Sequence, residues 1–215
     1  MSAIELLNWA RGPALQVAVA IFIIGMIIRV LEVWLLGRKK DLSEARGNAT
    51  AAGWRTILTR SVPPPGMWSH LIVGYVFHIG FLIALLFFVP HILFFKDIFG
   101  IRWPGLPNGL IDAVTIITLA AMAYTLFIRI SDPVRRMLST FDDYFAWLVT
   151  FLPLLTGYLA FHRHAGDYTM MLAMHIMSVN LLLVAFPFTK LTHAVTLFLA
   201  RWYNGAIAGR KGVRV

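Results

Sequence analysis

Four histidines lie inside long apolar segments of this chain of 215 residues. His78 and His91 fall in one such segment, and His175 and His193 in another. Polar side chains at membrane depth are costly, and they usually face the interior of a helix bundle. One such histidine is explained by a hydrogen bond between helices, but four in two segments favour a common function. Imidazole is an axial ligand of haem iron, so haem binding is the chemistry that these residues predict first.

The spacing of the four histidines predicts how they pair. His175 and His193 are eighteen positions apart, so on one continuous helix they share a face and lie about 27 Å apart along the axis. His78 and His91 are thirteen positions apart, about 20 Å along the axis but rotated by roughly 220°, so a tilt or a kink at Pro90 must realign them. If the two helices are antiparallel, His78 matches His193 in depth and His91 matches His175. Two stacked haem sites, each with two histidine ligands, are therefore predicted.

Three further histidines are alternatives to this set. His70 is the rival ligand to His91, but it lies only about 12 Å along the helix from His78, a poorer match to the span between His175 and His193. His162 and His164 flank Arg163 in a short loop. A solvated loop is their ordinary interpretation, and a metal or proton-exit role is the alternative.

The composition is that of a multi-pass membrane protein. Of the residues, 59% are hydrophobic and 13% charged, and the mean hydropathy is +0.76, whereas soluble domains carry about 25% charged residues. The chain has no cysteine, which excludes disulfides, thiolate zinc sites, cysteine-ligated iron–sulfur clusters and covalent c-type haem. The net charge of +9 fits basic cytoplasmic loops better than a nucleic-acid partner.

Five segments are long and apolar enough to span a bilayer. They cover roughly residues 13–36, 67–95, 109–130, 143–161 and 168–200. The breaker clusters at 61–66, 102–109 and 131–136, with the loop at 162–167, separate them. The sequence therefore predicts one all-α membrane domain over residues 1–215, a bundle of five transmembrane helices.

The basic residues predict the orientation of this bundle. Those on one side are Arg38, Lys39, Lys40, Arg46, Arg55 and Arg60 after the first segment, Arg129, Arg135 and Arg136 after the third, and Arg201, Arg210, Lys211 and Arg214 in the tail. The other side carries Arg11, Lys96, Arg102 and Arg163. By the positive-inside rule the N-terminus is outside and the C-terminus is cytoplasmic, in the inner (plasma) membrane of the cell.

Two motifs resemble the gamma subunit family of respiratory nitrate reductases. The last segment reads HIMSVNLLLVAFPFTKLTHA over 175–194, with Pro-Phe-Thr-Lys-Leu between two histidines, and FHIG at 77–80 is similar to the first ligand site on that family's second helix. The resemblance covers most of the chain. It implies two non-covalent b-type haems between the second and fifth helices, a quinone as substrate and electron transfer with an iron–sulfur partner subunit, expected on the cytoplasmic side.

Carried over by position, the resemblance makes His78 and His193 the ligands of the haem nearer the cytoplasm. His175 and His91 would then hold the haem nearer the outside. The family's second ligand on that helix falls ten residues after the first, where this chain has Phe88, so the fourth ligand is open between His91 and His70. This departure points to a relative of the nitrate reductase subunit, of the kind that serves complexes with heterodisulfide-reductase-like or hydrogenase-linked partners. The chain is then an electron-transfer subunit with no catalytic residue of its own.

Three cations are candidates for contacts with these ligands. Lys96 lies five positions beyond His91 and could bind a quinone oxygen, although an interfacial anchor is its simpler interpretation. Lys190 and Arg29 are candidate partners of haem propionates. Snorkelling explains Lys190 equally well, and pairing with Glu32 explains Arg29.

Two other functions compete with the cytochrome. A proton or ion transporter whose histidines form a relay would need acids facing the histidines and discontinuous helices. A cofactor-free membrane anchor would leave the paired histidines without a purpose.

Overall fold

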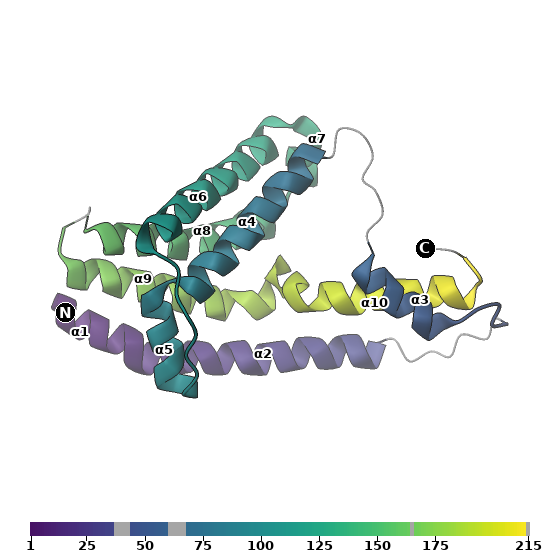
Figure 1. Ribbon diagram of the computed structural model, residues 1–215, viewed down its shortest axis with the longest axis horizontal. Helices are drawn as coiled ribbons and strands as arrows, with labels where there is room; N and C mark the ends of the chain where they lie inside the picture. The colour runs from purple at the N-terminus through teal and green to yellow at the C-terminus, as the bar shows by residue number, and fades with distance from the viewer. Residues whose placement is uncertain (37–43, 60–67, 164–165, 214–215) are drawn as a thin grey trace. The chain divides into compact units, whose positions relative to one another are not determined.

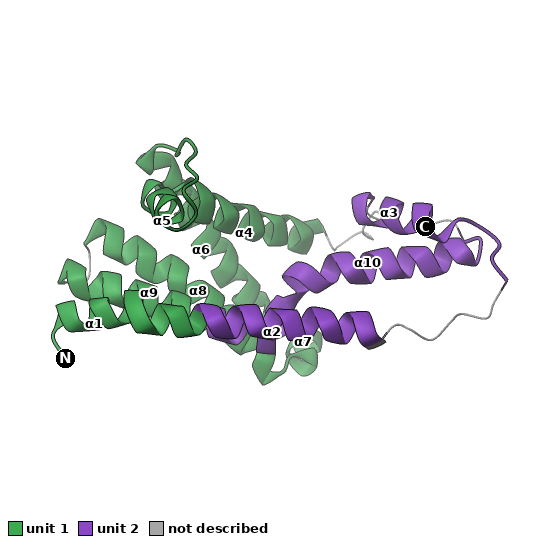
Figure 2. Cartoon of the chain, turned by 90° about the horizontal axis from the view of Figure 1, so that it is seen from below, with its two compact units in different colours: residues 1–18, 65–182 green, residues 19–64, 183–215 purple. Residues whose placement is uncertain are grey.

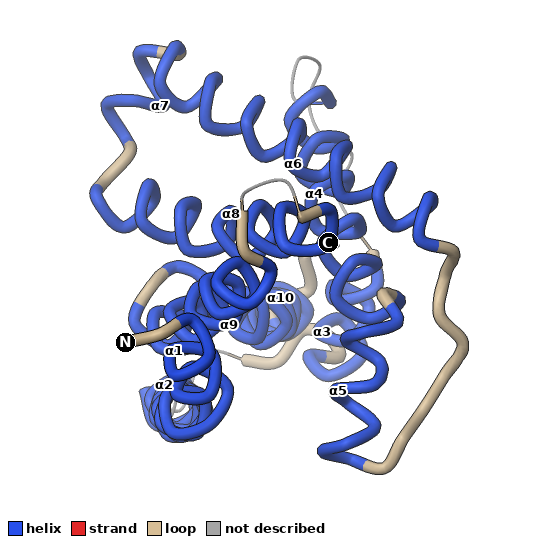
Figure 3. Tube along the Cα trace, turned by 90° about the vertical axis from the view of Figure 1, so that its left-hand side faces the viewer, coloured by secondary structure: helices blue, strands red, loops and turns tan. Residues whose placement is uncertain are grey.

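The structure is a computed structural model that describes residues 1–36, 44–59, 68–163 and 166–213. These residues form helices and no strand (Figure 1, Figure 3). The elements are α1 (Ala3–Trp9), a π-helical turn η1 (Ala10–Ala14), α2 (Leu15–Leu36), α3 (Ala49–Leu58), α4 (Trp68–Phe87), α5 (Val89–Phe99), α6 (Asn108–Ser131), α7 (Pro133–Leu138), α8 (Phe141–His162), α9 (Tyr168–Ala185), the 3₁₀ turns η2 (Phe186–Phe188) and η3 (Lys190–Thr192), and α10 (His193–Arg210).

Five of the described helices are long and apolar enough to cross a membrane. They cover Ala3–Leu35, Trp68–Phe87, Asn108–Ser131, Phe141–His162 and Tyr168–Phe188. The prediction of an all-helical protein with five segments long and apolar enough to span a membrane is therefore confirmed for the described residues. The side of the membrane on which each terminus lies stays a prediction.

The chain forms two compact units (Figure 2). Unit 1 comprises residues 1–18 and 65–182, and unit 2 comprises residues 19–64 and 183–215. A single domain over residues 1–215 stays a prediction.

Unit 1 is held together by packing between α4, α6 and α8. Its buried core is formed by Ala84, Met122 and Leu154, one residue from each of these helices. Gly80 allows α4 and α6 to approach closely, because a Cβ at this position would overlap Thr118 Oγ1. Small residues at such contacts are the usual means by which membrane helices pack.

The second predicted helix is divided in two, which corrects the expectation of one helix over 67–95. α4 ends at Phe87 and α5 begins at Val89, because Phe88 adopts an extended conformation with φ −77° and ψ 125°. Pro90 causes the break, since it has no N–H to donate to the carbonyl of Leu86 and is favoured in the first turn of a new helix. The indole Nε1 of Trp103 donates to that Leu86 carbonyl instead, at 2.6 Å.

The fifth predicted helix is also divided, so the expectation of a single helix over 168–200 is wrong. α9 ends at Ala185, two 3₁₀ turns follow, and α10 starts at His193. Pro187 and the extended Thr189, with φ −119° and ψ 176°, interrupt the helical hydrogen bonds. His175 and His193 therefore do not share the face of one continuous helix.

The N-terminal segment is bent at the π-helical turn η1. Gly12 has φ −100° and ψ −107°, outside the helical region, and Pro13 follows it. The side-chain amide of Asn180 on α9 donates to the carbonyl of Ala10 at 2.9 Å, and both residues are buried. π-turns of this kind often occur at functional sites, and this one contains Arg11.

Unit 2 contains the break in the fifth segment and the C-terminal helix. Arg29 on α2 donates through Nε to the carbonyl of Pro187 at 2.8 Å, and Gly25 leaves room for the Pro187 ring. The helix α3, in a region expected to be a loop, begins after the side-chain cap of Asn48 and packs along α10. Gly205 lies at this contact, where a Cβ would overlap Thr56 Oγ1.

Candidate functional site

The break between α4 and α5 positions His91. Breaking a helix leaves its last carbonyl groups without intrahelical donors, and His91 Nδ1 lies 3.0 Å from the carbonyl oxygen of Ala84 and 3.1 Å from that of Leu85. A carbonyl oxygen only accepts hydrogen bonds, so Nδ1 carries the proton and Nε2 keeps its lone pair. The same bonds that close the end of α4 therefore fix the tautomer that binds a metal through Nε2.

His175 on α9 is fixed in the same way against α8. Its Nδ1 lies 3.1 Å from the carbonyl oxygen of Pro153, so Nδ1 again carries the proton. Gly157, one turn further along α8, makes room for the ring, since a Cβ there would lie 3.0 Å from His175 Cε1. Metal-binding histidines are usually oriented by such a hydrogen bond to a backbone carbonyl.

His91 and His175 lie next to each other inside unit 1. Their ring centroids are 6.1 Å apart and their planes are inclined by only 15°. Both histidines line a cavity of about 440 Å³ whose walls are mostly apolar and aromatic, including Phe88, Phe94 and Phe161. This volume is in the range of pockets that hold small molecules and cofactors.

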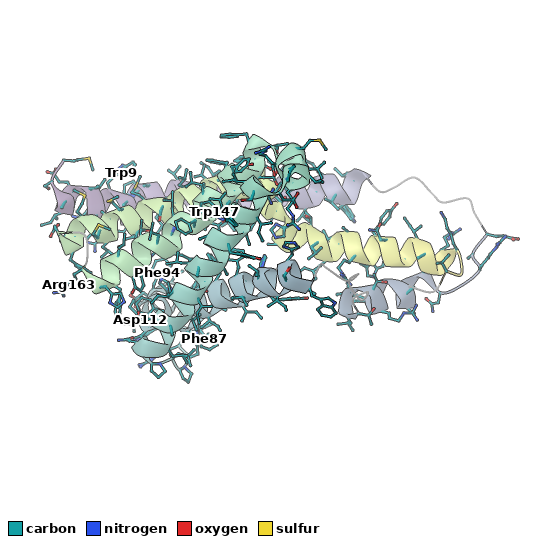
Figure 4. All side chains as sticks on the ribbon, turned by 90° about the horizontal axis from the view of Figure 1, so that it is seen from above. Trp9, Phe87, Phe94, Asp112, Trp147 and Arg163 are labelled. Carbon is teal, nitrogen blue, oxygen red and sulfur yellow. The ribbon has the colours of Figure 1, made fainter. Side chains whose placement is uncertain are left out.

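A few polar side chains also line this cavity. Arg11 contributes a guanidinium group from η1, and Asp112, near the start of α6, contributes a carboxylate. Asp112 Oδ1 lies 3.0 Å from Nε2 of His162, the last residue of α8. Figure 4 shows Asp112 and Phe94 toward the same end of unit 1 as Arg163. An apolar cavity with a small number of polar groups near its edge is typical of a ligand site.

In the other predicted pair, His78 and His193, each imidazole also has its Nδ1 next to a backbone carbonyl. His78 Nδ1 lies 2.6 Å from the carbonyl oxygen of Gly74, and His193 Nδ1 lies 2.6 Å from that of Lys190. Both histidines therefore also carry the proton on Nδ1. His78 belongs to unit 1 and His193 to unit 2, so their pairing stays a prediction.

The remaining candidates have other surroundings. Lys96 is exposed on α5 and is absent from the residues that line the cavity, whereas His70 lines a separate cavity near the start of α4. Arg29 pairs with Glu32 at 2.8 Å, as one of its two expected interpretations predicted, and it also binds the Pro187 carbonyl. The assignments of Lys96, Lys190 and Arg29 to a quinone or to propionates stay predictions. Outside the described residues lie His164, Arg38, Lys39, Lys40, Arg60 and Arg214.

The pair of Asp112 and His162 and the place of Arg11 at the cavity were not predicted from the sequence. Asp112 and His162 are 50 positions apart, and only the packing of α6 beside α8 brings them together. The sequence did contain a hint of this contact. Asp112 and His162 each lie at the end of an apolar segment, where a polar side chain can turn toward the bundle. Arg11 was counted only as a loop charge, although the Gly-Pro after it signalled a bend in the chain.

The site contains few side chains that can bind a metal ion. Among the residues that the structure describes, no group of three or more histidines, aspartates or glutamates is arranged to hold a metal ion. Two imidazoles fall short of the four protein ligands of a typical structural zinc site. They match a metal whose equatorial ligands come from a macrocycle, as in haem.

A comparison with curated proteins finds a relative from Nitratidesulfovibrio vulgaris, strain Hildenborough. The two sequences are 30% identical over 208 residues, which cover 90% of this chain and 89% of the relative. The relative's name states no activity. No protein-family model matches the chain, and no solved structure matches it.

Proposed function

The chain belongs to the same family as this Nitratidesulfovibrio vulgaris protein, and we propose that it is a membrane-bound cytochrome b with two non-covalent b-type haems. In this proposal it transfers electrons between the quinone pool and an iron–sulfur partner subunit of a respiratory complex. It would do so from the inner (plasma) membrane, with its N-terminus outside and its C-terminus in the cytoplasm.

The observation that carries the proposal is the geometry of His91 and His175. Two imidazoles bound to one metal by bonds of about 2 Å would have centroids about 6 Å apart, since each centroid lies roughly 1 Å behind its nitrogen. The measured separation is 6.1 Å, with both Nδ1 atoms turned to backbone carbonyls and both rings on the wall of the cavity. The residues present therefore fit a haem with two histidine ligands.

A haem held by two imidazoles supplies one-electron transfer and leaves no open iron position for oxygen. The chain's own contribution is to orient the imidazoles and to exclude water. The carbonyls of Ala84 and Pro153 hold the two rings in the required tautomer, and the aromatic walls keep the cavity apolar. Arg11 places a guanidinium group on the cavity wall, and we propose that it pairs with a haem propionate. Lys190 and Arg29 stay the other candidates for this role.

The pair of Asp112 and His162 has a separate part in this proposal. Quinol oxidation releases protons, and the carboxylate Oδ1 and imidazole Nε2 of this pair share one proton over 3.0 Å. Both residues lie at helix ends, where a proton can pass to solvent. We therefore assign this pair the role of proton acceptor, while Lys96 stays the candidate for a contact with the quinone oxygen.

Two observations favour the histidine-relay transporter as the second candidate. The helices α4 and α9 end in breaks at Phe88 and Phe186, and the carboxylate of Asp112 contacts the imidazole of His162. Transporters use broken helices near the membrane midplane. However, Asp112 is the fifth residue of α6 and His162 the last of α8, so this acidic pair lies near a membrane surface rather than at the centre.

One measurement separates the cytochrome from the transporter and from a cofactor-free anchor. The purified protein should show a b-type alpha band in a dithionite-reduced minus oxidised spectrum, with a haem-to-protein ratio near two. A protein with correct folding and no haem would overturn the proposal. A ratio near one would remove one of the two sites, and the histidine variants described below would identify which one.

A further inference from the structure

A second cavity in unit 1 lies between α4, α6 and α7 and takes no part in the proposed haem site. Its volume is about 270 Å³. The polar side chains that line it are His70 from α4, Tyr124, Thr125 and Arg129 from α6, Arg135 from α7, and Ser139. The hydroxyls of Ser139 and Thr125 already donate to the carbonyls of Arg135 and Met122, so the donors that matter for a ligand are those of the arginines, His70 and Tyr124. No carboxylate is among the described residues that line this cavity.

The two arginines keep donors available after their internal bonds are counted. Arg129 uses Nη1 for Asp143 at 3.2 Å and for Ser139 Oγ at 2.9 Å. Arg135 uses Nε for Asp132 at 3.2 Å. A guanidinium group has five N–H donors, so each ion pair fixes the position of the arginine and leaves other donors on the cavity wall. Planar guanidinium donors match the oxygens of a phosphate group.

The surroundings of this cavity point to a lipid as the source of the phosphate. It lies where α4 begins and α6 ends, with α7 at the same end of the unit (Figure 1), which is the level of the lipid headgroups for helices that span a bilayer. Beside it, Met137 is 77% and Phe141 79% exposed, and Trp68 at the start of α4 is also exposed. These apolar side chains offer a surface for acyl chains next to the donors.

We propose that the cavity lined by His70, Tyr124, Arg129, Arg135 and Ser139 binds the phosphate of an anionic phospholipid. The positive-inside rule assigns this end of unit 1 to the cytoplasmic leaflet, where anionic lipids and basic pockets between helices meet. The site is independent of haem and of the proposed electron transfer.

The chain offers a matched pair of variants for the test. Arg135 lines the cavity, whereas its neighbour Arg136 is exposed and does not, so Arg135→Gln and Arg136→Gln change the net charge equally. Delipidated protein in detergent is titrated with phosphatidylglycerol or phosphatidylcholine, and bound lipid is counted by native mass spectrometry. A second series adds inorganic phosphate as a competitor.

The expected result is tighter binding of phosphatidylglycerol than of phosphatidylcholine. Arg135→Gln should weaken phosphatidylglycerol binding about fivefold or more, as expected for one basic residue near a membrane surface, and Arg136→Gln should leave it unchanged within about twofold. Tyr124→Phe, which retains both arginines, should also weaken binding, and circular dichroism should show that all variants are folded. Equal effects of the two arginine variants, or equal binding of the two lipids, would overturn the proposal. Displacement of the lipid by inorganic phosphate at equal concentration would assign the site to free phosphate instead.

Discussion

The imidazole rings of His91 and His175 lie nearly parallel, with centroids 6.1 Å apart, although the residues belong to different helices and are 84 positions apart in the chain. Each ring is held by a backbone carbonyl at Nδ1. Two rings fixed in this way present their Nε2 lone pairs without a change of tautomer. Substitution of either histidine is therefore the most direct test of the proposed haem site.

We expect His91→Gln and His175→Ala each to lower the haem-to-protein ratio from near two to near one. A glutamine amide at position 91 can still donate to the carbonyls of Ala84 and Leu85. The free energy of unfolding of the haem-free variant should therefore equal that of the haem-free parent to within about 1 kcal/mol, the net contribution of one hydrogen bond. Met174→Ala, an exposed neighbour of His175, is the control. A ratio unchanged in both histidine variants would rule out this pair as ligands, and loss of a haem in His70→Ala would identify the rival.

Gly157 is expected to control the orientation of His175. A Cβ here would lie 3.0 Å from Cε1 and 3.2 Å from Nδ1 of the ring, so Gly157→Ala should tilt or displace the imidazole by a few tenths of an ångström. The expected result is an altered low-spin ferric EPR signal of one haem and a reduced occupancy of that site. Gly109→Ala, where a Cβ meets nothing within 4 Å, should leave both signals unchanged. Identical spectra for the two variants would contradict this assignment.

Gly80 should be essential to the packing of α4 on α6. In Gly80→Ala the new Cβ would overlap Thr118 Oγ1, and overpacking of this kind costs about 1–3 kcal/mol. Thermal unfolding in detergent measures this loss. The double variant Gly80→Ala with Thr118→Ala should recover much of it, because the overlapping oxygen is removed. Gly74→Ala, which meets open space, should be neutral, and a loss there equal to that at Gly80 would show that packing is not the cause.

Arg201 is expected to hold α3 against α10. Its guanidinium donates through Nε to the carbonyl of Thr56 at 3.0 Å and through Nη2 to the carbonyls of Thr56 and Thr59. Hydrogen bonds from charged groups contribute about 1.5–3 kcal/mol, so Arg201→Ala should accelerate hydrogen exchange across α3 by about tenfold or more. Arg55→Ala, which removes an exposed charge from α3 itself, is the control. Unchanged exchange in Arg201→Ala would mean that the glycine contacts alone retain α3.

The orientation can be tested directly because the chain has no cysteine. Ile4→Cys and Val213→Cys place single thiols at exposed positions near the two ends. A membrane-impermeant maleimide added to intact cells should label position 4 and not position 213. Labelling of position 213 alone would invert the predicted topology, and labelling of both would place the ends on the same side.

The sequence predicted the third and fourth helices to within two residues, because their apolar runs end at clear signals. α6 ends at Ser131, before Asp132 and Pro133, and α8 begins at Phe141 after the capping box of Thr140 with Asp143. Local patterns of this kind need no knowledge of the rest of the fold. The division of the fifth segment at Pro187 was missed, because the arginine that satisfies the freed carbonyl is 158 positions away in the chain.

The candidate site was predicted in part. The spacing of the histidines predicts that His91 pairs with His175. It also predicts a kink at Pro90 that realigns His91. That His91 also closes the end of α4 was not anticipated, since the break frees carbonyls that only the folded backbone identifies. Asp112 and His162 are 50 positions apart in the chain. Their contact depends on how α6 and α8 pack, so a local sequence pattern cannot predict it.

The 3₁₀ turns between Ala185 and His193 separate the orientations of the two histidines of the last segment. On a continuous α-helix a spacing of eighteen residues would fix both side chains on one face, because each residue turns the helix by about 100°. Here the helical register is interrupted between His175 and His193, so the direction of His193 depends on the turns and on the start of α10. The direction of His175 depends on α8 and α9. A substitution in the turns can therefore change the direction of His193 without a change in the register of α9.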